Sequence, residues 1–141
     1  MVKPLKVALI GAGKMGEAII AGLLKSSHYT PKDIMAQEII ETRRRYIQQT
    51  YKIECIDDVK KVVTFADIII IAVKPGDVKK VLDTIAPLMK KDKILTSIAA
   101  GVTLEFLTKN LPAEVPVIRI MPNLACFVRE GMMTICPSEN T

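Results

Sequence analysis

The 141-residue sequence has few of the residue types on which many catalytic and metal sites depend. It contains one histidine, His28, and three widely spaced cysteines, Cys55, Cys126 and Cys136, with no Cys-x-x-Cys pair. A single histidine without a nucleophile motif argues against a Ser-His-Asp hydrolase, and the cysteine spacing argues against a zinc or redox-pair site. We therefore expect no metal site, and reduced thiols of the kind found in the cytoplasm.

Aromatic residues and long apolar runs are also scarce. Aromatic residues make up 4% of the chain, so the net charge of +5 lacks the stacking side chains that usually accompany a nucleic-acid site. The longest apolar stretch, residues 66–73, is interrupted by Asp67 and is too short to cross a bilayer. No apolar signal core precedes the first predicted strand. These features predict a cytoplasmic protein that binds neither nucleic acid nor membrane, and whose basic charge suits an anionic cofactor or substrate.

The most informative feature that is present lies near the start of the chain. Residues 6–16 read Lys-Val-Ala-Leu-Ile-Gly-Ala-Gly-Lys-Met-Gly, a short apolar run followed by G-x-G-x-x-G. The run 7–10 is typical of a strand, and apolar residues recur afterwards at helical spacing, at positions 15, 18, 19, 22 and 23. A strand, a glycine turn and an amphipathic helix are the context in which this motif binds a dinucleotide.

Each glycine of the motif has its own expected task. Gly11 permits the tight turn after the strand, Gly13 lets a diphosphate approach the backbone, and Gly16 lets the helix lie close to the strand. The free N–H groups at the start of the helix would then face the phosphates. Because glycines also occur in ordinary turns, the motif alone is a weak signal, and its context is what favours nucleotide binding.

Strand-like and helix-like segments alternate along the rest of the chain. Strands are predicted at 7–10, 33–37, 53–56, 68–73, 94–98 and 117–120, with a further one at 132–136. Helices are predicted after residue 13, at 41–50, up to residue 63 with Asp57 or Asp58 as cap, at 78–89, and at 104–111 with Thr103 as cap. This alternation predicts one α/β domain over residues 1–141: a doubly wound, mostly parallel Rossmann sheet in the order 3-2-1-4-5-6 with room for extra edge strands.

In such a sheet, ligands bind beyond the carboxyl ends of the strands. Glu38 follows the second strand, 22 residues past Gly16, where a carboxylate would bind the ribose diol of NADH and repel the 2′-phosphate of NADPH. Arg43, Arg44 and Arg45 follow about one helical turn later, and an arginine fork matches a phosphate. Glu38 favours NADH, while the arginines keep NADPH open; both features could also be solvated surface.

Three further loops lie at the same predicted edge. Lys74 follows the most apolar strand and would face a cofactor, an acidic substrate or solvent. Ala99, Ala100 and Gly101 are small enough for a nicotinamide ring to approach the backbone, or form only a turn before a helix. Asn123, after Met121-Pro122, offers a donor and an acceptor near the ring, but is also a common turn residue.

Four motifs together resemble one enzyme family. Gly-Ala-Gly-Lys-Met-Gly at 11–16, Ala-Val-Lys-Pro-Gly at 72–76, Ser-Ile-Ala-Ala-Gly-Val at 97–102 and Met-Pro-Asn at 121–123 are similar to pyrroline-5-carboxylate reductase. The resemblance covers essentially the whole chain but only the N-terminal, cofactor-binding part of the family. The matched part does not include the family's helical C-terminal domain, which dimerises and contacts the substrate carboxylate.

The resemblance implies a function and a set of site residues. The family reduces 1-pyrroline-5-carboxylate to L-proline in proline biosynthesis, with NADPH or NADH, and the full-length enzyme is expected to be a homo-oligomer. The residues that match its cofactor segments are Gly11, Ala12, Gly13, Lys14, Met15, Gly16, Ala72, Val73, Lys74, Pro75, Ala99, Ala100 and Gly101. Asn123 matches the asparagine near the reacting ring, and no residue is assigned as the proton donor. Glu38 departs from the small polar residue often found there.

Two other functions are compatible with the sequence. The chain would suit the N-terminal domain of another NAD(P)-dependent dehydrogenase, of the hydroxyacid or deazaflavin-dependent type, because the fold alone does not separate them. It would also suit a nucleotide-binding module without catalytic activity. The Val-Lys-Pro-Gly and Met-Pro-Asn segments speak against the first alternative.

Overall fold

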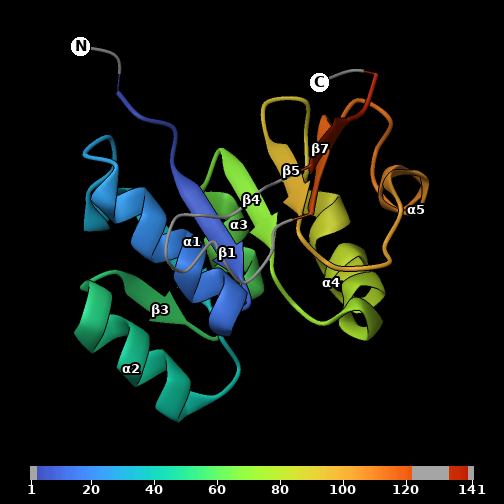
Figure 1. Ribbon diagram of the computed structural model, residues 1–141. Helices are drawn as coiled ribbons and strands as arrows, with labels where there is room; N and C mark the ends of the chain where they lie inside the picture. Colours follow the sequence, from blue (N-terminus) through green and yellow to red (C-terminus); the bar gives the residue numbers. More distant parts are fainter. Residues whose placement is uncertain (1–2, 122–133, 140–141) are drawn as a thin grey trace.

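A computed structural model gives the architecture of the chain and describes residues 3–121 and 134–139. Seven strands form one sheet in the order β3-β2-β1-β4-β5-β6-β7, with helices on both faces (Figure 1). The strands are β1 (Val7–Ile10), β2 (Ile34–Gln37), β3 (Glu54–Ile56), β4 (Ile68–Ile71), β5 (Ile94–Ser97), β6 (Val117–Met121) and β7 (Thr134–Pro137). The first six are parallel and β7 pairs antiparallel to β6, which confirms the doubly wound Rossmann sheet and its strand order.

Within the described residues, five α-helices connect or flank the strands. They are α1 (Lys14–Lys25), α2 (Glu41–Tyr51), α3 (Val59–Phe65), α4 (Val78–Ile85) and α5 (Leu104–Lys109). The predicted caps of two of them are present: the Asp58 carboxylate accepts from the Lys61 N–H at 3.1 Å, and the Thr103 hydroxyl accepts from the Phe106 N–H at 3.1 Å. Asp57, the other predicted cap of α3, instead accepts from the Gln37 side-chain amide at 3.1 Å.

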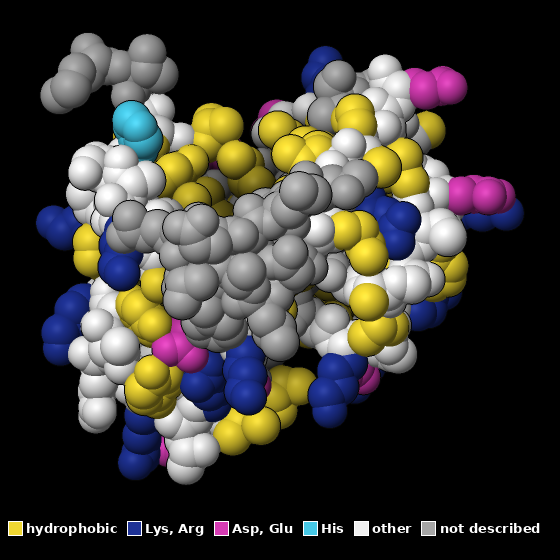
Figure 2. Space-filling view, in the orientation of Figure 1, with side chains coloured by type: hydrophobic (Ala, Val, Ile, Leu, Met, Phe, Trp, Pro, Cys, Tyr) yellow, Lys and Arg dark blue, Asp and Glu magenta, His cyan; other side chains and the backbone are white. Residues whose placement is uncertain are grey.

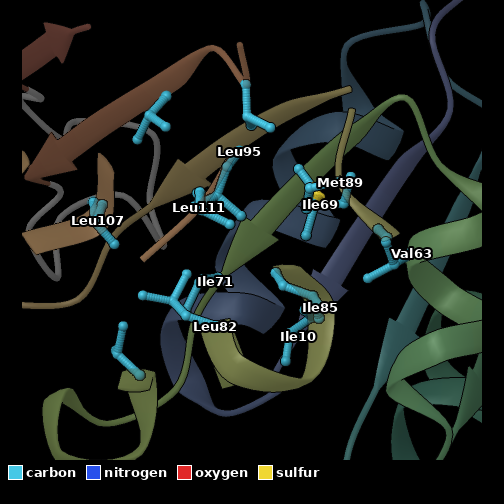
Figure 3. Packing of buried hydrophobic residues seen from close by; sticks show 14 of the residues in the cluster. Ile10, Val63, Ile69, Ile71, Leu82, Ile85, Met89, Leu95, Leu107 and Leu111 are labelled. Carbon is cyan, nitrogen blue, oxygen red and sulfur yellow. The ribbon is translucent and has the colours of Figure 1, made fainter. Parts of the chain in front are cut away.

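Two apolar clusters pack on the two faces of the sheet. Because side chains alternate along a strand, Ala8 and Ile10 face α3 and α4, whereas Val7 and Leu9 face α1 and α2. Figure 3 shows Leu82 and Ile85 of α4 against Ile10 and Ile71 of the sheet. Strands buried on both faces need continuous apolar runs, which explains the Ile68–Ile71 sequence of the central strand β4.

Several element ends differ from the sequence prediction. The helix expected over 78–89 ends at Ile85, and a 3₁₀ turn follows over Ala86–Leu88, because Pro87 has no N–H to continue the helical ladder. Strand β4 ends at Ile71, two residues early, where the chain turns toward the loop after β1. Gly22, predicted on the apolar face of α1, is exposed, and Ile20 is buried instead.

Candidate functional site

The loop between β1 and α1 is built around Gly11. This residue has a φ of +97°, which favours glycine, and its N–H donates to the Gln37 carbonyl at 2.8 Å. A β-carbon at this position would lie 2.6 Å from the Ala72 carbonyl oxygen. Gly11 therefore lets the chain turn sharply between the ends of β2 and β4.

The other two glycines of the motif differ from each other. A β-carbon at Gly16 would lie 2.6 Å from the Gly11 carbonyl oxygen, so Gly16 is needed for the close approach of α1 to the loop. A β-carbon at Gly13 would meet no atom within 4 Å, and Gly13 has an ordinary φ of −75°. Because nothing in the fold requires a glycine at position 13, the open space beside it fits a ligand that approaches the backbone.

The start of α1 faces the same open space. The N–H groups of Lys14, Met15 and Gly16 have no hydrogen-bond partner among the described residues. Such groups, together with the positive end of the helix dipole, suit an anion. Lys and Arg side chains lie along the lower edge of Figure 2, toward which β1 and β4 run in Figure 1. The donors and charge at this edge fit a diphosphate.

Glu38 lies directly against the glycine loop. Its Oε2 accepts from the Ala12 N–H at 2.9 Å and its Oε1 accepts from the Ile40 N–H at 3.2 Å. Its own N–H donates to the Ile56 carbonyl at 3.0 Å, which holds the end of β2 beside β3. The structure therefore brings together the acid and the loop that the 22-residue spacing placed at one site.

The three arginines of α2 each have partners within the protein. Arg43 donates from Nε to the Ala12 carbonyl at 2.7 Å, and Arg44 donates from Nη1 to the Glu38 and Ile39 carbonyls at 2.8 and 2.6 Å. The Arg45 guanidinium pairs with Glu41 at 2.6 Å on the exposed side of the helix. Arg43 and Arg44 therefore contact the glycine loop and the residues after β2, unlike the solvated face that the sequence left open as one alternative.

Glu17, in the first turn of α1, is a residue that the sequence analysis missed. Its Oε2 pairs with Arg43 Nη2 at 2.5 Å, and its Oε1 accepts from the hydroxyls of Tyr46 and Tyr51 at 2.7 and 2.6 Å. Burial favours a higher pKa for Glu17, but the hydrogen bonds from Tyr51, Tyr46 and Arg43 outweigh it, and the pKa is lowered. Glu17 is therefore an ionised carboxylate that ties α1 to α2. Partners 26 to 34 residues away left no local signal in the sequence.

The segment after β4 borders the glycine loop from the other side. The Ala72 N–H donates to the Ile10 carbonyl at 2.8 Å, so Ala72 and Val73 lie beside Gly11. Lys74 and Pro75 are exposed, and the Lys74 ammonium has no partner in the described part of the chain. Residues 99–101 follow β5, the next strand along the same edge, with Ala99 buried and Ala100 and Gly101 exposed. Asn123 lies outside the described residues.

Other features of the described chain lie apart from this edge. A cavity of about 640 Å³ lies beside α5, lined by residues such as Leu104, Thr108 and Ser138, and none of its lining residues belongs to the glycine loop or to the segment after β4. Burial raises the pKa of the Cys55 thiol to about 11, which makes it a poor nucleophile. Within residues 3–121 and 134–139, no helix is long and apolar enough to cross a membrane.

Comparison with known proteins supports the resemblance predicted from the four motifs. Pyrroline-5-carboxylate reductase of Escherichia coli is 37% identical over 133 residues, which are 94% of this chain and 49% of that protein. The structure of a pyrroline-5-carboxylate reductase from Coxiella burnetii superposes with a TM-score of 0.92 at 24% identity, over 97% of this chain and 51% of that one. The structure of Plasmodium falciparum pyrroline carboxylate reductase, described with NADP bound, superposes with a TM-score of 0.87 at 24% identity. The match covers 100% of this chain and 51% of the Plasmodium falciparum chain. The chain spans about half the length of the curated relatives it matches.

A family model also matches this chain. The model described as "NADP oxidoreductase coenzyme F420-dependent" matches residues 6–101, which include the glycine loop, Glu38, the segment after β4 and residues 99–101. The chain therefore belongs to this family of NAD(P)-dependent oxidoreductases and is similar to the N-terminal half of pyrroline-5-carboxylate reductases.

Proposed function

We propose that the chain is the cofactor-binding part of a pyrroline-5-carboxylate reductase, which reduces 1-pyrroline-5-carboxylate to L-proline with NADH or NADPH. The observation that carries the proposal is the open space at Gly13 beside the unpaired N–H groups of α1. The motif resemblance and the names of the relatives support the reaction. The cytoplasmic location and a homo-oligomeric full-length enzyme belong to the same proposal.

Each loop has a role in this proposal. The N–H groups at the start of α1 bind the diphosphate, and Lys14 adds a positive charge at the same helix end. Ala72, Val73, Lys74 and Pro75 border the bound cofactor on the β4 side, and Ala99, Ala100 and Gly101 lie on the nicotinamide side. The family motif would assign Asn123 to the nicotinamide as well. The bound cofactor supplies the hydride for the imine carbon, and the protein orients it. No described residue is assigned as the proton donor.

We propose NADH as the preferred cofactor. The Glu38 carboxylate ends β2 and would accept from both ribose hydroxyls, whereas the 2′-phosphate of NADPH would meet a like charge there. The Plasmodium falciparum structure, described with NADP bound, shares only the fold with this chain at 24% identity. Replacing Glu38 with Ser is expected to shift preference toward NADPH; equal relative affinities before and after the substitution would remove Glu38 from the site.

Calorimetric titration with each reduced cofactor tests the site. We expect Gly13→Val to weaken binding of both cofactors by about tenfold or more, because its side chain fills the space beside the diphosphate. Gly22→Val is the matched control, since a β-carbon at Gly22 also meets no atom within 4 Å but lies farther along α1. Unchanged binding by Gly13→Val, or no binding by the unmodified chain, would contradict the proposed site.

The description of the family model favours one second candidate, hydride exchange between NADP and a deazaflavin. Because the chain corresponds to about half of its relatives, rates of cofactor oxidation are measured on a full-length version of the protein, with the Escherichia coli relative as reference. The substrates that separate the candidates are 1-pyrroline-5-carboxylate, a deazaflavin and a 2-oxo acid. The proposal expects acceleration by 1-pyrroline-5-carboxylate alone. Faster oxidation with the deazaflavin would replace the proposed substrate.

A further inference from the structure

The contacts of Glu17 reach the candidate cofactor site through one side chain, Arg43. Glu17 holds Arg43 Nη2 at 2.5 Å, and the Arg43 guanidinium also lies 5.0 Å from the centre of the Tyr46 ring. The side chains of Arg43 and Glu17 are only 27% and 12% exposed. The guanidinium is therefore held in one place by a largely buried partner, unlike a surface ion pair.

Arg43 and Glu38 bind the same residue of the glycine loop. Arg43 Nε donates to the Ala12 carbonyl at 2.7 Å, and the Ala12 N–H donates to Glu38 Oε2 at 2.9 Å. The Arg43 guanidinium and the Glu38 carboxylate, which is proposed to bind the ribose, thus contact the two polar backbone groups of the same residue, Ala12. An arginine so close to the ribose is well placed to bind a 2′-phosphate if it is free to turn.

We propose that Glu17 determines the cofactor selectivity of this site by holding Arg43 against Ala12, away from the 2′-phosphate of NADPH. The inference rests on the proposed function and deepens it. It assigns a selectivity role to a residue that touches neither the ribose nor the diphosphate, so Glu17 is a positioning residue.

The charges explain why Arg43 stays with Glu17. If Arg43 turned toward a phosphate, the largely buried Glu17 carboxylate would lose its cation and keep only the hydroxyls of Tyr46 and Tyr51. Removing the cation from a largely buried ion pair is costly. The guanidinium would also lose the Ala12 carbonyl. The neighbouring Arg44 is engaged as well, because its Nη1 is bound by the carbonyls of Glu38 and Ile39.

The central test is the substitution Glu17→Gln, with affinities for NADH and NADPH measured by titration. The glutamine keeps an oxygen that accepts from Tyr46 and Tyr51 but removes the charge that holds Arg43. We expect the affinity for NADPH relative to NADH to rise roughly tenfold, the effect of about one charged hydrogen bond. Glu41→Gln is the matched control, because it removes the same charge from the exposed pair with Arg45, and it is expected to leave the ratio unchanged.

Two further variants keep the inference falsifiable. The double variant Glu17→Gln with Arg43→Gln is expected to lose the gain in NADPH affinity, since the released cation is absent. Arg43→Gln alone tests the proposal without changing Glu17: it is expected to weaken both cofactors by similar factors through the loss of the Ala12 contact. A selective loss of NADPH binding in Arg43→Gln would show that Arg43 already binds the phosphate, and would overturn the inference.

The outcomes separate this inference from the proposed function. If the unmodified chain binds NADH and Glu17→Gln has the same selectivity as Glu41→Gln, the inference is wrong and the proposed function stands. If the unmodified chain binds neither cofactor, both are wrong. A merely structural role of Glu17 would weaken both cofactors together and leave their ratio unchanged, which also contradicts the inference.

Discussion

The two pairs of helices that cover the sheet are held together in different ways. Between α1 and α2, the Glu17 carboxylate receives a guanidinium and two phenol groups, in addition to apolar contacts. Between α3 and α4, the described residues form no side-chain hydrogen bond or ion pair, and buried residues such as Val63 and Leu82 make the contact. Apolar burial is non-directional and supplies stability, whereas charged hydrogen bonds fix geometry. The polar connection lies beside the glycine loop, where the proposed cofactor site would require a fixed geometry.

The largest effect is expected from Gly11→Ala, at the start of the positioned loop. The new β-carbon would lie 2.6 Å from the Ala72 carbonyl oxygen, in a backbone with a φ of +97°. Backbone strain and overpacking together predict a loss of about 4 kcal/mol in the free energy of unfolding, measured by urea denaturation. Gly22→Ala is the control, because its site is open and helical, and it is expected to raise stability slightly. Equal stability of the two variants would show that the loop can shift.

The next largest effect is expected in the apolar contact between α3 and α4. Leu82 of α4 is 0% exposed, so Leu82→Ala leaves a cavity in the core and is expected to cost about 3 kcal/mol of unfolding free energy. Because no side-chain hydrogen bond or ion pair among the described residues connects α4 to the glycine loop, the ratio of NADH to NADPH affinity is expected to stay the same. Leu82→Met, which nearly conserves volume, is the control. A change in cofactor selectivity in Leu82→Ala would mean that the two helix pairs are not independent.

The same contrast explains what the sequence could predict. The strand order, the role of Gly11 and the proximity of Glu38 to the loop follow from local patterns: alternation, glycine spacing and the rule that parallel strands end at one edge. The Glu17 contacts could not be predicted, because helical periodicity tells which face of α1 is apolar but not which residues of α2 lie opposite. Arg43 shows the consequence: its neighbours in sequence suggested a phosphate ligand or a solvated face, and its actual partner lies 26 residues away.

Acid titration measures the Glu17 contribution directly. The pKa of Glu17 is lowered from its ordinary value near 4.5, so its carboxylate stabilises the fold fully above that pH, and the contribution is lost as the pH falls through the lower folded-state pKa. At neutral pH, Glu17→Gln is expected to cost about 1–2 kcal/mol of unfolding free energy, because Arg43 loses its charged partner. The difference from the unmodified chain is expected to shrink as the pH falls below 4.5, followed by urea denaturation across the acid range. A difference that is constant with pH would show that charge is not what Glu17 contributes.

The smallest effect is expected from Asp83→Asn. Like Glu17→Gln, it replaces a carboxylate with an amide, but on α4, which packs against α3 through apolar contacts. Asp83 pairs with Lys79 one turn away on α4, and the two side chains are 60% and 54% exposed. Water and salt screen such a pair, and its lysine precedes its acid along the helix, which is the less favourable order, so we expect a cost of less than about 0.5 kcal/mol. Urea denaturation of Asp83→Asn beside Glu17→Gln, at low and high salt, measures both. If the two substitutions lower the free energy of unfolding equally, burial does not make the Glu17 contacts stronger than an exposed ion pair. A clearly larger loss of unfolding free energy in Glu17→Gln would instead show that the Glu17 charge stabilises the fold. The same charge holds Arg43 against Ala12 of the glycine loop.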